Sequence, residues 1–158
     1  MGVSGCGKSS VASALAERLG YQYIDGDDYH PQANIDKMRQ GIPLNDADRQ
    51  GWLETLNQLL VNASSGTALA CSALTPKYRA ILTHNVKNAH FVFLKGDFDT
   101  IWQRHQQRKH HFFKGKAMLE DQFQTLSEPS GDNVISVDVR LSINAIVDMV
   151  CQQIKAVG

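Results

Sequence analysis

The residues with the clearest chemical potential stand at the start of the chain, where residues 2–9 read Gly-Val-Ser-Gly-Cys-Gly-Lys-Ser. A glycine, four residues and then Gly-Lys-Ser is the pattern of a phosphate-binding loop, whose backbone N–H groups and following helix N-terminus surround phosphate groups. Lys8 would neutralise the β- and γ-phosphates of a nucleoside triphosphate, and the Ser9 hydroxyl would coordinate Mg²⁺. The residues expected to bind ATP in this loop are Gly2, Ser4, Gly5, Cys6, Gly7, Lys8, Ser9 and Ser10.

A helix is expected directly after this loop, because apolar residues recur at helical spacing between Val11 and Leu19. A glycine-rich turn that merely opens an ordinary helix is the alternative, but the helix begins where a phosphate loop requires one. Such a loop normally follows a buried apolar strand in the middle of a parallel sheet, and here only Met1 precedes Gly2. We therefore expect the natural protein to start upstream of Met1.

Composition indicates one globular domain over residues 1–158, with a single core. Sixteen basic and sixteen acidic residues leave a formal net charge of zero, which argues against nucleic-acid or membrane-surface binding. The three cysteines have neither zinc-ligand spacing nor a disulfide pattern, and the chain shows no leader or membrane-span pattern. These features predict a cytoplasmic protein.

Strand-like and helical patterns alternate along the chain. β-prone runs are expected at 21–24, 67–71, 91–94 and 134–137. Helices are expected at 31–40, from Asn45 or Asp46 through Leu60, at 77–82, from Asp97 or Asp99 through Arg108, at 118–126 and at 143–157. This order predicts a three-layer α/β/α phosphate-loop fold with a parallel sheet whose first strand is missing.

Acidic side chains follow the first of these predicted strands, in the turn Asp25-Gly26-Asp27-Asp28. Ligands bind at the carboxyl ends of parallel strands, so this turn should face the phosphate loop, although a solvated turn has the same composition. Asp25 and Asp27 can divide two tasks of phosphoryl transfer. One carboxylate can hold a water on Mg²⁺, and the other can accept a hydrogen bond from the attacking hydroxyl. No Asp ends the next strand, which favours the Asp25 turn as the metal side.

A second group of charges lies late in the chain. Arg104 and Arg108 are four residues apart, on one face of the predicted helix, and the basic stretch 109–116 that follows resembles a lid. A closing lid would bring these cations over the phosphates, with Arg104 near the nucleotide and Arg108 acting in catalysis. The alternative is a solvated basic helix end.

Taken together, these features resemble the gluconokinases of the small phosphate-loop kinase superfamily, which includes shikimate and adenylate kinases. The resemblance runs from Met1 almost to the end. It is carried by the loop and by Asp25–Pro31, Asn34–Met38, Gly41–Asp46, Asp48-Arg49, Trp52-Leu53, Cys71–Leu74, Tyr78-Arg79, Leu94–Asp97, His111–Phe113 and Gln122–Leu126.

The resemblance implies transfer of the ATP γ-phosphate to the 6-hydroxyl of D-gluconate, with Mg²⁺ as the metal, by a homodimer. By analogy with shikimate kinases, Asp27 would face the acceptor hydroxyl and Asp25 the metal. The gluconate carboxylate requires a cation, and arginine is best suited to bidentate contact. The residues implied to bind substrate are Asp27, His30, Lys37, Arg49, Arg79 and His111.

Two departures from this family stand out: the strand before the loop is missing, and His110 replaces the usual glycine before His-Phe-Phe. A glycine-to-histidine change stiffens a hinge or adds a cation. Two other readings stay open. One is a kinase of the same fold acting on shikimate, a nucleoside monophosphate or another sugar acid. The other is a regulatory module that binds ATP without phosphorylating anything.

Overall fold

The computed structural model describes residues 1–107 and 115–157, with side chains up to Lys155. Helices and strands alternate as predicted. Arg108, His110 and His111 lie outside the described residues, as does most of the expected lid, whereas Lys116 is the first residue of a helix. The elements are α1 (Lys8–Leu19), β1 (Gln22–Asp25), the 3₁₀ helix η1 (Gly26–Tyr29), α2 (Gln32–Arg39), α3 (Asp46–Val61), β2 (Thr67–Ala70), α4 (Pro76–Thr83), β3 (Phe91–Lys95), α5 (Phe98–Gln106), α6 (Lys116–Thr125), β4 (Val134–Asp138) and α7 (Ile143–Val157).

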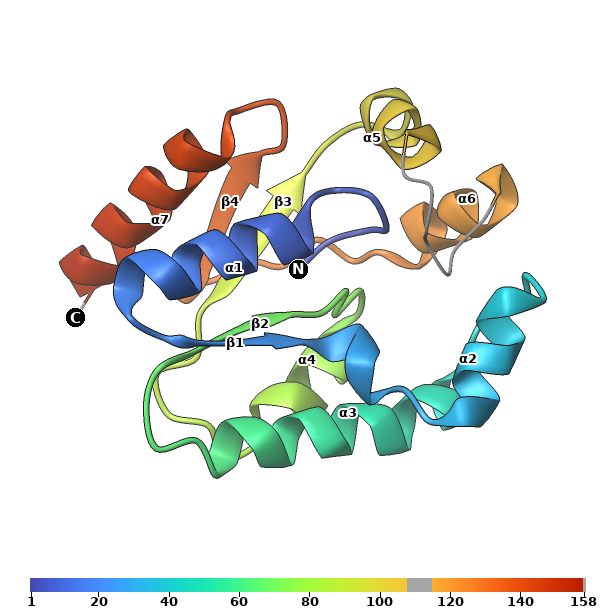
Figure 1. Cartoon of the computed structure of the whole chain (residues 1–158), viewed down its shortest axis with the longest axis horizontal. Coiled ribbons are helices and arrows are strands. Elements are labelled where there is room, and N and C mark those ends of the chain that lie inside the picture. Colours follow the sequence, from blue (N-terminus) through green and yellow to red (C-terminus); the bar gives the residue numbers. More distant parts are fainter. Residues whose placement is uncertain (108–114, 158) are drawn as a thin grey trace.

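All strand pairing in the described chain is parallel, which confirms the predicted strand direction, but the sheet is split. β1 pairs with β2, with Gln22 opposite Thr67. β3 pairs with β4, with Phe91 opposite Val134. The two pairs share no ladder, and Figure 1 shows them as separate halves with the N-terminus between them.

Met1 and Gly2 connect the two halves. The Met1 amine donates to the Val92 carbonyl at 2.6 Å, and the Leu94 N–H donates to the Met1 carbonyl at 3.0 Å. Hydrogen bonds alternate in this way in a parallel ladder, and they place Met1 opposite Phe93. On the other side the Gly2 N–H donates to the Ser72 carbonyl at 3.1 Å. These two residues thus occupy the end of a strand position between β2 and β3.

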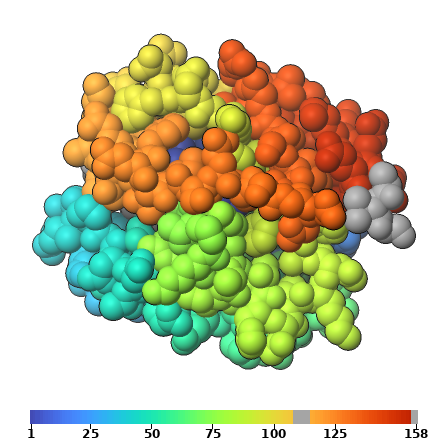
Figure 2. Space-filling view, turned by 180° about the vertical axis from the view of Figure 1, so that it is seen from behind, coloured from blue at the N-terminus to red at the C-terminus, as the bar shows by residue number. Residues whose placement is uncertain are grey.

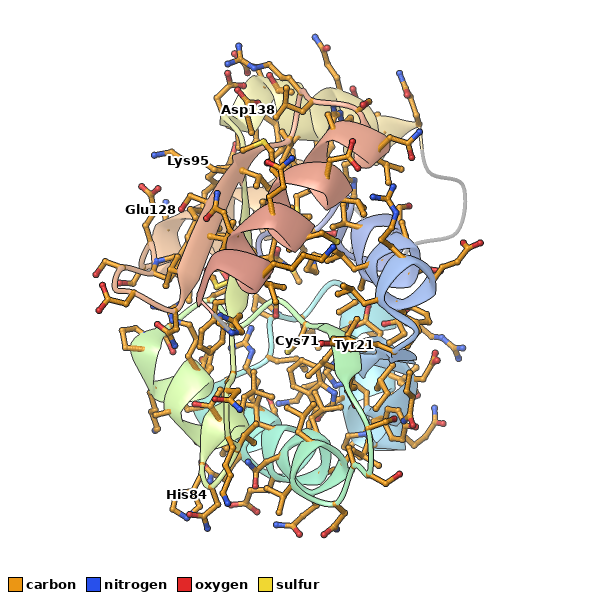
Figure 3. The ribbon with its side chains drawn as sticks, turned by 90° about the vertical axis from the view of Figure 1, so that its left-hand side faces the viewer. Tyr21, Cys71, His84, Lys95, Glu128 and Asp138 are labelled. Atoms are coloured by element: carbon orange, nitrogen blue, oxygen red, sulfur yellow. The ribbon has the colours of Figure 1, made fainter. Side chains whose placement is uncertain are left out.

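The rest of that position is a cavity of about 1180 Å³. Its lining comes from α1, from both strand pairs and from the Met1 side, and includes Leu15, Leu69 and Val92. Tyr21 and Cys71 also line it, and Figure 3 shows both where the two halves of the molecule meet. Burial raises the pKa of the Cys71 thiol to about 11. The interior between the half-sheets is therefore incompletely filled.

Helices cover the strands through the apolar stripes that the sequence predicts. α1 packs against β1, β2 and α7, while α3 packs against α4. Asn45 caps α3 in a capping box with Asp48, which places Trp52 and Leu53 in the core. None of the helices in the described ranges is long and apolar enough to cross a membrane.

A buried arginine joins α4 to the segment after α6. Arg79 donates to the Ala73 carbonyl at 2.8 Å and to the Ser127 carbonyl at 3.0 Å. The Ser127 N–H in turn donates to the Leu74 carbonyl. Figure 2 shows the green and orange segments side by side on this face.

Candidate active site

The phosphate loop has the backbone that its glycines predict. Gly7 is left-handed, with φ 100°, and α1 begins at the next residue, Lys8. A Cβ on Gly2, where φ is 146°, would lie 2.8 Å from the Cys6 sulphur. Glycine is therefore required at both ends of the loop. The Lys8 ammonium donates to the Val3 carbonyl at 3.0 Å and so lies folded across the loop.

The loop serine and the first carboxylate of the acidic turn lie together. The Ser9 hydroxyl donates to Asp25 Oδ2 at 3.3 Å, and the other Asp25 oxygen accepts the Asp27 N–H at 3.0 Å. Hydroxyl and carboxylate oxygens are the hard donors that Mg²⁺ prefers, and Mg²⁺ keeps several of its own waters. This pair therefore fits a Mg²⁺ site on the loop side of the turn.

The second carboxylate faces a buried histidine. His30 Nε2 lies 3.6 Å from Asp27 Oδ1, and the Asp27 side chain is 41% exposed while that of His30 is 2% exposed. The His30 ring stacks on Trp52 with ring centroids 4.0 Å apart. Trp52 is fixed by its own hydrogen bond to the Gly26 carbonyl at 2.7 Å. Asp27 thus combines solvent access with a rigid support.

A pocket over the loop gathers several predicted residues: Lys8, Ser9, Asp27, His30 and Arg49 all line it. Ser4, Gly5 and Gly7 contribute loop backbone to the same surface.

The three other predicted loop residues, Gly2, Cys6 and Ser10, do not line this pocket: Gly2 and Cys6 are buried behind it, and Ser10 is exposed on α1. The Arg104 side chain is not at the pocket either. The pKa of Asp138 is lowered to about 2, mainly by hydrogen bonds from Arg140, and the charge of Arg104 contributes to this shift. Arg108 and His111 lie outside the described residues.

The structure separates the described candidates for the substrate carboxylate. Arg49 lines the pocket; it donates through Nη1 to the Leu44 carbonyl at 2.6 Å and to the Tyr78 hydroxyl at 3.0 Å. Within the described residues its other nitrogens make no hydrogen bond. Lys37 instead pairs with Asp48 at 2.7 Å. Arg79 donates its hydrogen bonds to the backbone carbonyls of Ala73 and Ser127, and burial lowers its pKa.

Sequence reasoning did not assign a role to Gln122 of α6. Its Oε1 accepts the Ser4 N–H at 2.7 Å, and the residue is only 5% exposed. Gln122 therefore fixes the loop from a helix more than a hundred positions away in sequence. Ser72, which the sequence places at the ligand-binding end of β2, and Leu74 also line the pocket, although neither was named as a binding residue. The resemblance motifs contain all three, and no local spacing marks their contacts.

The fold and pocket together define a phosphate-loop kinase. The sequence matches the shikimate kinase family over residues 4–155. It is 44% identical over 160 residues to the thermoresistant gluconokinase of Escherichia coli K12, covering 98% of this chain and 91% of that protein. The gluconokinase of Gluconobacter oxydans 621H is 38% identical over 157 residues, with coverage of 98% and 86%.

Among solved structures, a gluconokinase from Sinorhizobium meliloti 1021 superposes with a TM-score of 0.90 at 38% identity, covering 99% of this chain and 90% of that one. The chain belongs to the gluconokinase family, within the wider shikimate-kinase group of phosphate-loop kinases. The predicted family is confirmed.

Proposed function

We propose that this protein transfers the γ-phosphate of ATP to the 6-hydroxyl of D-gluconate, giving 6-phospho-D-gluconate and ADP. The observation that carries the proposal is the single pocket that holds the loop residues Lys8 and Ser9 together with Asp27 and Arg49. Family membership supports the substrate, because the named relatives are gluconokinases. D-gluconate-dependent release of ADP by the purified protein tests it.

The pocket residues divide the work of transfer. The oxygen of the sugar hydroxyl forms a bond to the γ-phosphorus, and the bond between that phosphorus and the β,γ-bridging oxygen breaks. Asp27 accepts the proton that the hydroxyl loses. Lys8 stabilises the charge that develops on the phosphates. Ser9 and Asp25 would hold Mg²⁺ directly or through water, and the bound ion would neutralise part of the phosphate charge.

Arg49 is our proposed ligand of the gluconate carboxylate, because it is the described arginine that lines the pocket. Arg49→Gln should raise KM for D-gluconate roughly ten- to hundredfold, the effect of losing one charge-assisted hydrogen bond of about 1.5–3 kcal/mol, with KM for ATP nearly unchanged. Initial-rate kinetics measure both constants. Lys37→Gln is the matched control. A larger KM effect in the control would transfer the role to Lys37.

We further propose that the complete fold is a three-layer α/β/α sandwich whose sheet is continuous, in the order β1-β2-X-β3-β4, where X is a strand absent from the described residues. Support comes from the ladder that Met1 begins with β3 and from the cavity beyond it. Beyond the contacts that Met1 and Gly2 make, the edges that β2 and β3 turn toward this cavity have no ladder partner among the described residues, and an extended apolar segment would pair with them. Such a segment joined to the Met1 nitrogen would continue the existing ladder.

An N-terminal extension of about six Val- and Ile-rich residues should therefore stabilise the protein. We expect the free energy of unfolding to rise by about 3 kcal/mol or more, since two fully buried aliphatic side chains contribute about that much. A Gly/Ser extension of equal length is the control, because it cannot fill the cavity. Urea unfolding of the three forms makes the comparison, and equal stability of both extensions would contradict a strand position here.

The free energy of unfolding should also depend on pH. Desolvation lowers the pKa of the Met1 amine from 8.0 to about 6. The unfolded chain therefore binds a proton between pH 6 and 8 that the folded chain has released, so the free energy of unfolding should increase over this range by about 2–3 kcal/mol. Either extension converts the amine to an amide and should remove this contribution.

Two further proposals accompany the activity. A homodimer is proposed from the family resemblance, and a sedimentation-equilibrium mass of one chain would contradict it.

The cytoplasm is the proposed compartment, which the free and buried state of Cys6, Cys71 and Cys151 supports. Detection of the native protein in a secreted fraction would oppose that placement.

A further inference from the structure

We propose that Asn34 holds His30 in the neutral tautomer with its proton on Nε2, so that His30 is a positioning residue for the Asp27 carboxylate. This inference deepens the proposed function and rests on the role given there to Asp27. It changes the part expected for His30, which the family resemblance implied to be a substrate ligand.

The orientation of the Asn34 amide is decided by a backbone group. Asn34 Nδ2 donates one hydrogen to the Asp48 carbonyl at 2.9 Å. A backbone carbonyl can only accept, so nitrogen rather than oxygen must occupy this position. The same nitrogen lies 3.3 Å from His30 Nδ1 and directs its second hydrogen there. Asn34 is 2% exposed, so its partners are these two groups rather than bulk water.

This arrangement selects one state of the imidazole. His30 Nδ1 must accept, and a neutral ring that accepts at Nδ1 carries its hydrogen on Nε2. The stack on Trp52, with an interplanar angle of 17°, prevents the ring from turning away.

This tautomer determines which group of His30 faces the Asp27 carboxylate. His30 presents an N–H to Asp27 Oδ1, across 3.6 Å. This distance exceeds a hydrogen bond; catalytic contacts in unliganded enzymes are often long and tighten in the complex, and we expect the same of this one. With Nε2 protonated, His30 cannot accept the proton of the sugar hydroxyl at that nitrogen. It instead orients the Asp27 carboxylate through Oδ1.

Two substitutions separate this role from simple packing. The side-chain amide nitrogen of Gln reaches about as far as Nε2, whereas that of Asn reaches only the Nδ1 position. Both His30→Gln and His30→Asn lose the stack on Trp52, and their thermal stabilities should fall alike. We expect kcat of H30Q to exceed that of H30N by roughly tenfold or more, part of the 10²–10⁴ that a well-placed base contributes. KM for ATP should stay within about threefold in both. Equal kcat values would overturn the positioning role.

The tautomer itself is measured without any turnover. In a ¹⁵N-labelled protein, two-bond ¹H–¹⁵N correlation spectra distinguish a protonated from an unprotonated ring nitrogen. We expect His30 to show protonated Nε2 and unprotonated Nδ1 at neutral pH, and Asn34→Ala to show a mixture. A proton on Nδ1 in the unsubstituted protein would overturn the inference. Because this spectrum does not depend on activity, failure of the proposed function would appear separately, as absence of gluconate-dependent ADP release.

Discussion

Lys8→Ala is expected to abolish gluconate phosphorylation. The Lys8 ammonium lies across the phosphate loop on the Val3 carbonyl, where it meets the β- and γ-phosphates of a bound nucleotide. Removing one preorganised donor at a site of developing charge already lowers kcat by about 10²–10³, and here a full positive charge is lost as well. We therefore expect kcat to fall by roughly 10³ or more.

The measurement is single-turnover transfer of labelled γ-phosphate, which detects slow residual chemistry. Lys155→Ala is the control, because Lys155 lies exposed on α7, away from the loop. Its rate should equal that of the unsubstituted protein. Retention of more than about a tenth of the rate in Lys8→Ala would show that the loop lysine does not stabilise the transferring phosphate.

Asp27→Asn is the second substitution with a large expected effect. The carboxylate lines the pocket and is supported by His30, and the amide has nearly the same shape but cannot accept the hydroxyl proton. We expect kcat to fall by roughly 10²–10⁴, while the affinity for ATP stays within about threefold. The loss should therefore lie in transfer rather than in nucleotide binding.

Asp28→Asn is the matched control for this change, because Asp28 is the exposed neighbour in the same 3₁₀ helix. Steady-state kinetics give kcat, and calorimetric titration with ATP gives the affinity. Near-normal turnover in Asp27→Asn would remove Asp27 from the acceptor-hydroxyl role. A comparable loss in Asp28→Asn would assign the effect to the charge of the whole turn.

Much of this architecture was accessible from local patterns. The loop glycines and the helix that follows them depend on residues close together in sequence, and the structure confirms them. The sequence offered Asn45 or Asp46 as the cap of α3, and the structure has Asn45 there. The parallel strand direction follows from the strand and helix alternation, because such crossovers favour parallel neighbours. The acidic turn meets the loop for the same reason, and the Ser9–Asp25 contact bears this out.

The cation assignments needed the three-dimensional structure. The three candidates have the same charge in the sequence, and only their hydrogen-bond and ion-pair partners in the structure distinguish Lys37, Arg49 and Arg79. Lys37 is paired with a carboxylate and Arg79 with backbone carbonyls, so within the described chain Arg49 is the member of this group that lines the pocket. Gln122 was missed for a related reason, because its contact with Ser4 joins residues far apart in sequence.

The sequence did not predict that the sheet is split into two strand pairs. Met1 and Gly2 bond to both halves and thereby place the loop. The loop-to-Asp25 contact is retained although β2 and β3 do not pair. The site can therefore be assembled while the sheet behind it contains a cavity.

Gluconate phosphorylation is tested by ADP release from the purified protein with MgATP, measured with and without D-gluconate. We predict release that depends on D-gluconate and yields one 6-phospho-D-gluconate per ADP. ATP binding without gluconate-dependent release, both in this chain and in the form carrying the apolar N-terminal extension, would contradict kinase activity and favour a nucleotide-binding regulatory module.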